Sequence, residues 1–151
     1  MRKILFRGQT RRYGEKVRMG DGFKLPSRWV YGGVLQGVSA HSIIYGGENA
    51  DDPGEGLEKW VVHTDTLGQF TGLTDKNGKK IFEGDACRFY GIEGHADYVV
   101  FWDDTTSQWT VRQIDFGAKD VLDGYFAERC EVIGNIHDNP ELMEVYENGT
   151  V

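Results

Sequence analysis

The dipeptide Asn77-Gly78 places the strongest constraint on what this chain can fold into. It lies between two short segments that can both extend. Asn-Gly is typical of the type I′ turn of a two-residue β-hairpin, because both central residues of that turn need a positive φ. With this turn, Asp75 would face Lys80 and Leu73 would face Phe82 across the two strands. The sequence therefore predicts a hairpin centred on Asn77-Gly78.

The use of glycine and aromatic residues extends this interpretation to the whole chain. Of 151 residues, 21 are Gly and only 3 are Pro, and aromatic residues make up 13%. Many strands joined by tight turns use residues in this way. We therefore predict a mainly β fold in one domain, 1–151. It would have an irregular strand region at 1–66, a small barrel-like antiparallel core at about 67–137 and a short helix at 138–147.

Apolar runs and turn residues locate the individual elements. Gly46–Glu58 has almost no apolar residue and is predicted to be an exposed loop. Asn139-Pro140 is a typical helix start, with Asn as the N-cap and Pro in the first position. The segment 121–126 fits either a strand or one helical turn. Strands are predicted at 3–7, 29–35, 40–45, 59–64, 86–90, 96–102, 108–114 and 130–136.

Charge is distributed unevenly along the chain. Residues 1–28 contain nine Lys or Arg and two acids, whereas residues 29–151 contain eight basic residues and 22 acids. Such a basic arm can bind a polyanion, or it can neutralise the acidic remainder of the same or a neighbouring molecule. Basic residues interleaved with aromatic ones, here Tyr13 and Phe23, can contact phosphates and stack on bases. The candidate nucleic-acid-binding residues are Arg7, Arg11, Arg12, Lys16 and Arg18.

The two cysteines and the chain start indicate a cytoplasmic protein. Cys87 and Cys130 stand singly in apolar strand-like runs, which predicts buried, reduced thiols. The start of the chain does not have the pattern of a signal peptide. No apolar run approaches the roughly 18 residues that a membrane span needs.

Residues that could carry chemistry are present but scattered. The four histidines, His41, His63, His95 and His137, lie far apart, so a zinc site would have to be assembled by the tertiary structure. The segment from Asp75 to Gly78 does not fit EF-hand spacing, because its Gly falls at position four instead of six. We predict no catalytic residues, no metal ligands and no cofactor.

Three blocks of the sequence form a pattern that spans nearly the whole chain. The first is Arg7-Gly8 with Trp29-Val30-Tyr31-Gly32, the second is Gln69–Leu73 with Ile81–Asp85, and the third is Glu131–Ile136 with Asn139–Leu142. Together these blocks resemble the YopX family of phage and prophage proteins. The resemblance implies a mainly β fold and a phage-encoded protein of the bacterial cytoplasm. It implies no activity and no site residues, and the basic insertion between Gly8 and Trp29 is longer than is usual in the family.

Three functions are compatible with these observations. The first is a non-enzymatic phage accessory protein that binds an unknown protein partner or a second copy of itself. The second is nucleic-acid binding through the basic arm, although the chain as a whole is acidic, whereas dedicated nucleic-acid binders are usually basic. The third is an enzyme whose site is assembled from distant residues, which would require a polar pocket with perturbed His or carboxylate groups. We expect the first.

Overall fold

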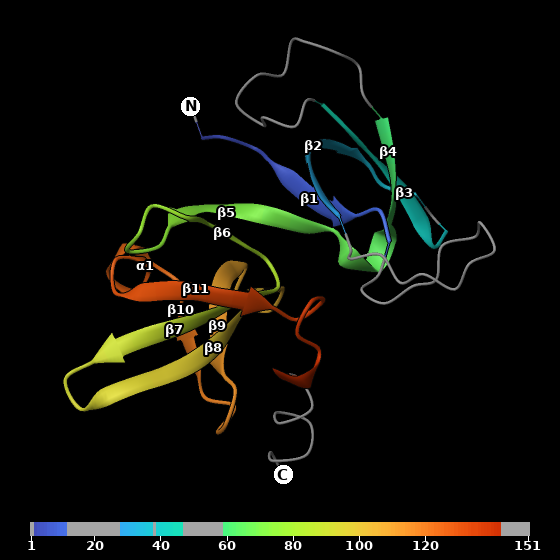
Figure 1. Ribbon diagram of the computed structural model, residues 1–151. Helices are drawn as coiled ribbons and strands as arrows, with labels where there is room; N and C mark the ends of the chain where they lie inside the picture. The colour runs from blue at the N-terminus through green and yellow to red at the C-terminus, as the bar shows by residue number, and fades with distance from the viewer. Residues whose placement is uncertain (1, 12–27, 38, 47–58, 143–151) are drawn as a thin grey trace. The chain divides into compact units, whose positions relative to one another are not determined.

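The computed structural model describes residues 2–11, 28–37, 39–46 and 59–142. The chain divides between Gln69 and Phe70 into two compact units, 1–69 and 70–151. The described residues are mainly β, as predicted, and all the strand pairs are antiparallel (Figure 1).

The first unit is built from four strands in sequence order. These are β1 (Phe6–Gln9), β2 (Trp29–Leu35), β3 (His41–Tyr45) and β4 (Lys59–His63), followed by the 3-10 turn η1 (Thr64–Thr66). Each strand pairs with the next, and β1 also pairs with the start of β5 (Gly68–Thr74). Val30, Ile44 and Val62 form the buried core of this unit. Region 1–66, predicted to be irregular, therefore contains a regular antiparallel sheet.

The second unit contains a hairpin and a five-stranded sheet. The hairpin is formed by β5 and β6 (Lys80–Phe82). The sheet has the order β10-β9-β8-β7-β11. Its strands are β7 (Asp85–Gly91), β8 (Gly94–Asp103), β9 (Gln108–Gln113), β10 (Lys119–Val121) and β11 (Cys130–Asn135). Because β10 and β11 lie at opposite edges, the strands of this sheet form no closed barrel.

The core of the second unit lies on one face of the five-stranded sheet. Ile81 of the hairpin packs there with Val100, Val111 and Phe126, and half-buried Leu73 joins them. Phe126 stacks on Phe89 and meets the ring of Tyr98 edge-on, with ring centroids 4.9 and 5.2 Å apart. Offset and edge-on aromatic pairs of this kind add to the stabilisation from burial.

The segment that fitted either strand or helix contains both. β10 ends at Val121, and the one-turn helix α1 (Gly124–Ala127) follows. Asp123 is the N-cap, and its carboxylate accepts a hydrogen bond from Phe126 N at 2.9 Å. A side-chain acceptor at this position satisfies an otherwise unpaired backbone N–H of the first turn. The predicted helix at 138–147 is described only as far as residue 142, where residues 141 and 142 are helical.

The hairpin exists, but its predicted turn and register are wrong. Gly78 N donates to Asp75 O at 3.0 Å, so Lys76 and Asn77 are the central turn residues. Gly78 has a φ of 81°, whereas Asn77 is not among the residues with positive φ. This combination is a type I turn followed by a glycine bulge, which makes a three-residue loop. The predicted pair of Asp75 with Lys80 therefore does not form.

The extra loop residue shifts the pairing of the strands. Thr74 faces Lys80, and Phe82 faces Phe70 instead of the predicted Leu73. The rings of Phe70 and Phe82 lie 5.6 Å apart. The register shifts again between Phe70 and Thr74, a segment that contains Gly72 with a φ of 90°. Leu73 is thereby available to the core of the second unit.

Both cysteines are buried in the second unit, as predicted. The neighbouring Cys130 thiol and burial together raise the pKa of Cys87 well above its usual range. Both cysteines are 0% exposed, so an alkylating reagent cannot reach either sulfur while the protein is folded. We expect both thiols to resist iodoacetamide in the folded protein and to react fully in guanidinium, as measured by intact mass. Rapid labelling of the folded protein would contradict this arrangement.

Candidate functional site

An exposed apolar surface on the first unit is the feature of the described residues best suited to binding. It lies on the face of β2, β3 and β4 opposite the core. Partners that face each other in an antiparallel pair project to the same side of the sheet. We define the β2–β4 outer face by three rows of facing residues: His41 with His63; Leu35 with Ile43 and Val61; and Gly33 with Tyr45 and Lys59.

The central row is apolar and open to solvent. Leu35 is 62% exposed and Val61 is 60% exposed, while Ile43 between them is half-buried. Tyr45 in the next row is 43% exposed. An antiparallel sheet with one solvated face normally carries polar residues on that face. Here the central row of the outer face is apolar, although Val34, Ile44 and Val62 on the opposite face already belong to the core.

The row at one end consists of two imidazoles. The ring centroids of His41 and His63 lie 5.2 Å apart, with 38° between the ring planes. His41 is exposed and His63 is half-buried. Residues 22 positions apart in the sequence are thus brought together by the pairing of β3 with β4. Nothing in the local sequence around either histidine predicts this pair.

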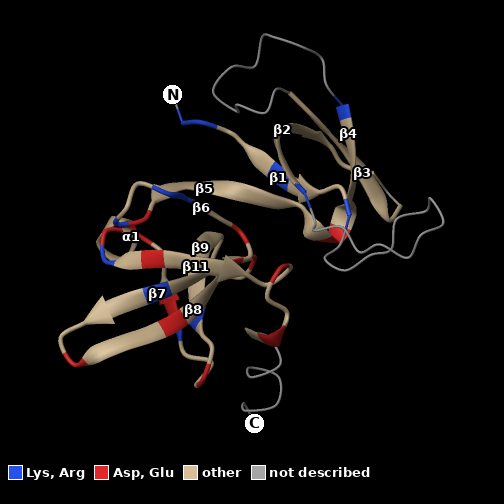
Figure 2. Ribbon diagram, in the orientation of Figure 1, with Lys and Arg blue, Asp and Glu red and all other residues tan. Residues whose placement is uncertain are grey.

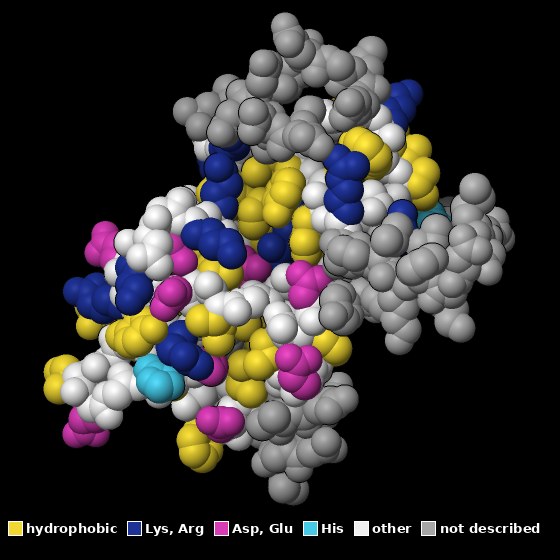
Figure 3. Space-filling view, in the orientation of Figure 1, with side chains coloured by type: hydrophobic (Ala, Val, Ile, Leu, Met, Phe, Trp, Pro, Cys, Tyr) yellow, Lys and Arg dark blue, Asp and Glu magenta, His cyan; other side chains and the backbone are white. Residues whose placement is uncertain are grey.

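Figure 3 shows hydrophobic side chains at the surface of the first unit beside Lys and Arg. Two arginines of this unit lie against tryptophan rings. The guanidinium of Arg7 is 4.4 Å from the centroid of Trp29, and that of Arg28 is 4.3 Å from Trp60. Cation–π contacts of this kind fix the position of the arginine and shield the aromatic ring.

The arm residues predicted to bind nucleic acid are only partly described. Arg7 is 6% exposed and Arg11 is half-buried. Arg12, Lys16 and Arg18 lie outside the described residues. Nucleic-acid binding through the arm therefore stays a prediction.

The affinity of the basic arm for a nucleic acid would fall as the salt concentration rises. Changing Arg11, Arg12 and Arg18 together to Ala should remove most of any affinity for DNA or RNA and flatten its dependence on salt, because fewer counterions are released. Fluorescence anisotropy with single- and double-stranded oligonucleotides at about 50 mM and 200 mM salt measures both quantities. Absence of binding by the unaltered protein at the lower salt would end this hypothesis.

The second unit carries paired charges on the face of its sheet opposite the core. Figure 2 shows a basic segment on β7 beside acidic segments on β8 and β11. Arg88 on β7 makes a bidentate contact with Asp97 on β8, at 2.9 and 3.3 Å. Tyr90 donates to Glu131 at 2.9 Å, and this bond raises the pKa of the tyrosine hydroxyl. These groups hold three neighbouring strands in register.

The described residues contain no cluster of side chains that forms a reactive site. No group of three or more His, Cys, Asp and Glu residues gathers there in a way that could hold a metal ion. Asp104 lies exposed in the turn after β8, as expected for a solvated turn. No described helix is long and apolar enough to cross a membrane.

The sequence blocks of the second unit that carry the family resemblance meet in the structure. Asp85 accepts a hydrogen bond from Phe82 N at 2.7 Å, which closes the turn between β6 and β7. Ile136 N donates to Gly84 O at 3.0 Å, so the end of β11 is bonded to that same turn. Asn135 in turn accepts from His137 N and Asp138 N. The hydrogen bonds of Gly84, Asp85 and Asn135 thus close turns and join strands.

The residues of the first block also join strands. Arg7 faces Tyr31 and Gly8 faces Val30 in the pairing of β1 with β2. Gly32 lies directly against β3, where a Cβ would come within 2.2 Å of Tyr45 O. The block thus marks the close contact of three strands.

The chain is similar to one family model and to a solved structure. No curated protein matches the chain. Among solved structures, protein EF1440 from Enterococcus faecalis is similar, with 26% sequence identity and a TM-score of 0.37, over 60% of this chain and 72% of that one. The family model described as YopX protein matches residues 28–144. The chain therefore belongs to the YopX family.

Proposed function

We propose that this YopX protein is a non-enzymatic accessory protein of a phage or prophage, acting in the bacterial cytoplasm by binding another protein. The observation that carries the proposal is the exposed apolar row of the β2–β4 outer face. Leu35 and Val61 are both about three-fifths exposed and lie on opposite sides of Ile43. Regular strands hold these side chains in place, so binding requires little ordering of the surface.

The composition of the face fits a protein interface. Its centre is apolar, and Tyr45, Lys59 and the two histidines at the ends are amphipathic or charged. Interfaces commonly have an apolar centre and a polar rim, with tyrosine enriched. Covering one Leu or Val side chain contributes about 1.5–3 kcal/mol. Since Leu35 and Val61 are each about three-fifths exposed, covering both contributes about 2–4 kcal/mol, which is about tenfold to several hundredfold in affinity.

The partner we favour is a protein with its own apolar surface, including a second copy of this chain. A double substitution, Leu35→Ser with Val61→Ser, keeps the strands but removes the apolar row. It should lower the yield of adducts cross-linked in host cells at least about tenfold. Sedimentation of the purified protein distinguishes self-association from binding to another protein. If the protein self-associates, the same double variant should abolish that association.

The matched control is Phe116→Ser. Phe116 is 76% exposed and belongs to the second unit. This variant should give the same adducts as the unaltered protein. The proposal would be refuted if the double variant formed the unaltered set of adducts while remaining folded, or if both variants lost them equally.

A further inference from the structure

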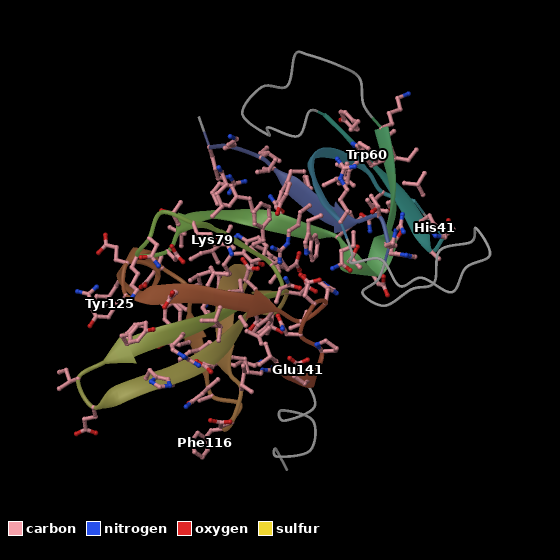
Figure 4. All side chains as sticks on the ribbon, viewed as in Figure 1. His41, Trp60, Lys79, Phe116, Tyr125 and Glu141 are labelled. Carbon is pink, nitrogen blue, oxygen red and sulfur yellow. The ribbon has the colours of Figure 1, made fainter. Side chains whose placement is uncertain are left out.

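The facing histidines at one end of the β2–β4 outer face have the geometry of a metal site. Figure 4 shows His41 at the start of β3. His41 and His63 are direct partners in the pairing of β3 with β4. Thr64 N donates to Ala40 O at 2.8 Å, so the adjacent pair is a hydrogen-bonded one. The histidines therefore occupy a non-hydrogen-bonded position, where facing side chains are closest.

The backbone beneath the two histidines is held by further bonds. The hydroxyls of Ser42 and Thr64 lie 2.7 Å apart, and Thr64 also donates to Ser39 O at 3.0 Å. Gly37 N donates to the Ser42 hydroxyl at 2.9 Å. These bonds surround the histidine pair on both strands. The two imidazoles are thus presented on a preorganised support, which lowers the entropic cost of binding a ligand between them.

The separation of the rings agrees with one shared ion. In a tetrahedral zinc site the Zn–N bonds are about 2.0–2.1 Å, and a ring nitrogen lies about 1.1 Å from its own centroid. Two imidazoles bound to one ion at the tetrahedral angle then have centroids about 5.1–5.3 Å apart. The observed distance is 5.2 Å. The separation of the two rings therefore matches that of two imidazoles that share one ion.

We propose that His41 and His63 together bind a divalent transition-metal ion, with zinc as the best fit. Imidazole nitrogen suits zinc, copper and nickel, whereas magnesium and calcium prefer oxygen ligands. Among the described residues no group of three or more metal-binding side chains gathers, so His41 and His63 are the two described ligands of the proposed site. This inference does not depend on the proposed function.

Binding of the ion would join two strands. β4 pairs only with β3 among the described strands, and it is the last strand in the order of its sheet. An ion held by one histidine of each strand cross-links β4 to β3. Because such an ion binds the folded state, it stabilises that state by an amount that rises with the logarithm of the free ion concentration above the Kd.

The test uses Zn²⁺ alone as the probe. Calorimetric titration of the full chain should show one Zn²⁺ per molecule, and His41→Ala and His63→Ala should each weaken binding at least about tenfold. Co²⁺ supplies a second measurement, since visible absorption bands report its coordination geometry. These bands should appear with the unaltered protein and be lost in both variants.

The control is His95→Ala. His95 is an exposed histidine of β8 in the second unit, and its removal should leave zinc binding unchanged. His41 is exposed, so His41→Ala tests the site even if His63→Ala proves unstable; His63→Gln provides a second, milder variant. Absence of zinc binding by the unaltered protein, or equal binding by the His41→Ala variant, would overturn the proposal.

Discussion

Replacing Asp75 with alanine is expected to lower the free energy of unfolding by about 3–5 kcal/mol. Asp75 is 5% exposed, and its carboxylate accepts three backbone hydrogen bonds, each 2.9 Å long. Asn77 N and Lys79 N donate to one oxygen, and Val132 N donates to the other. One side chain thereby shapes the hairpin loop and attaches it to β11, 57 residues further along the chain.

The loss should be large because alanine leaves all three donors without their acceptor. A buried N–H that loses its partner costs about 1–3 kcal/mol, and more when the acceptor was charged. Lys76 N, which donates to Cys130 O at 3.0 Å, would be left as the neighbouring backbone link between the loop and β11. We expect that link to weaken as well, because the loop that positions it is no longer held.

Chemical denaturation followed by circular dichroism measures this loss, and hydrogen exchange locates it. The amide of Val132 should exchange much faster in the Asp75→Ala variant. Asp104→Ala, in an exposed turn of the same unit, is the matched control and should change stability by less than about 0.5 kcal/mol. Equal stability of the two variants would show that the three hydrogen bonds do not hold the loop to β11.

Replacing Gly32 with alanine should produce the second large effect, a loss of at least about 2 kcal/mol. A Cβ at this position would lie 2.2 Å from Tyr45 O and 2.9 Å from Tyr45 C. Both are backbone atoms of β3, so a side-chain rotation cannot relieve the overlap. The strands β2 and β3 would have to move apart, which weakens the packing of Val30 and Ile44 beneath them.

Hydrogen exchange of the amides of β3 reports this change within the first unit. Gly124→Ala is the control, since a Cβ there meets no atom within 4 Å and alanine favours the helix α1. We expect Gly124→Ala to be neutral or slightly stabilising. If Gly32→Ala were tolerated equally well, then β2 and β3 would not approach each other as closely as described.

Most of the strands could be predicted from the sequence, because apolar runs and turn residues act locally. Regions 40–45 and 59–64 contain β3 and β4, and region 96–102 lies within the longer strand β8. The first strand was misplaced: β1 is Phe6–Gln9, not 3–7. Its residues contain no strict alternation, and only the pairing with β2 and β5 shows where the strand begins.

The hairpin shows why register was harder to predict than the elements themselves. Asn-Gly allows more than one turn, and the choice between them depends on the carboxylate of Asp75 and its distant partner, Val132 N. That partner belongs to β11, so the short segment of sequence around the turn does not contain it. The predicted register of Leu73 with Phe82 therefore failed, although the hairpin was correctly located.

The sequence by itself determined that this chain is mainly β, where most of its strands lie, and that it belongs with the YopX proteins, because turn chemistry and apolar patterning are encoded within a few neighbouring residues. Only the tertiary structure decided which strands are partners. It set His41 beside His63 and aligned Leu35, Ile43 and Val61 on one exposed face. Strand pairing joins residues that are distant in sequence, and its register depends on the packing of the whole unit.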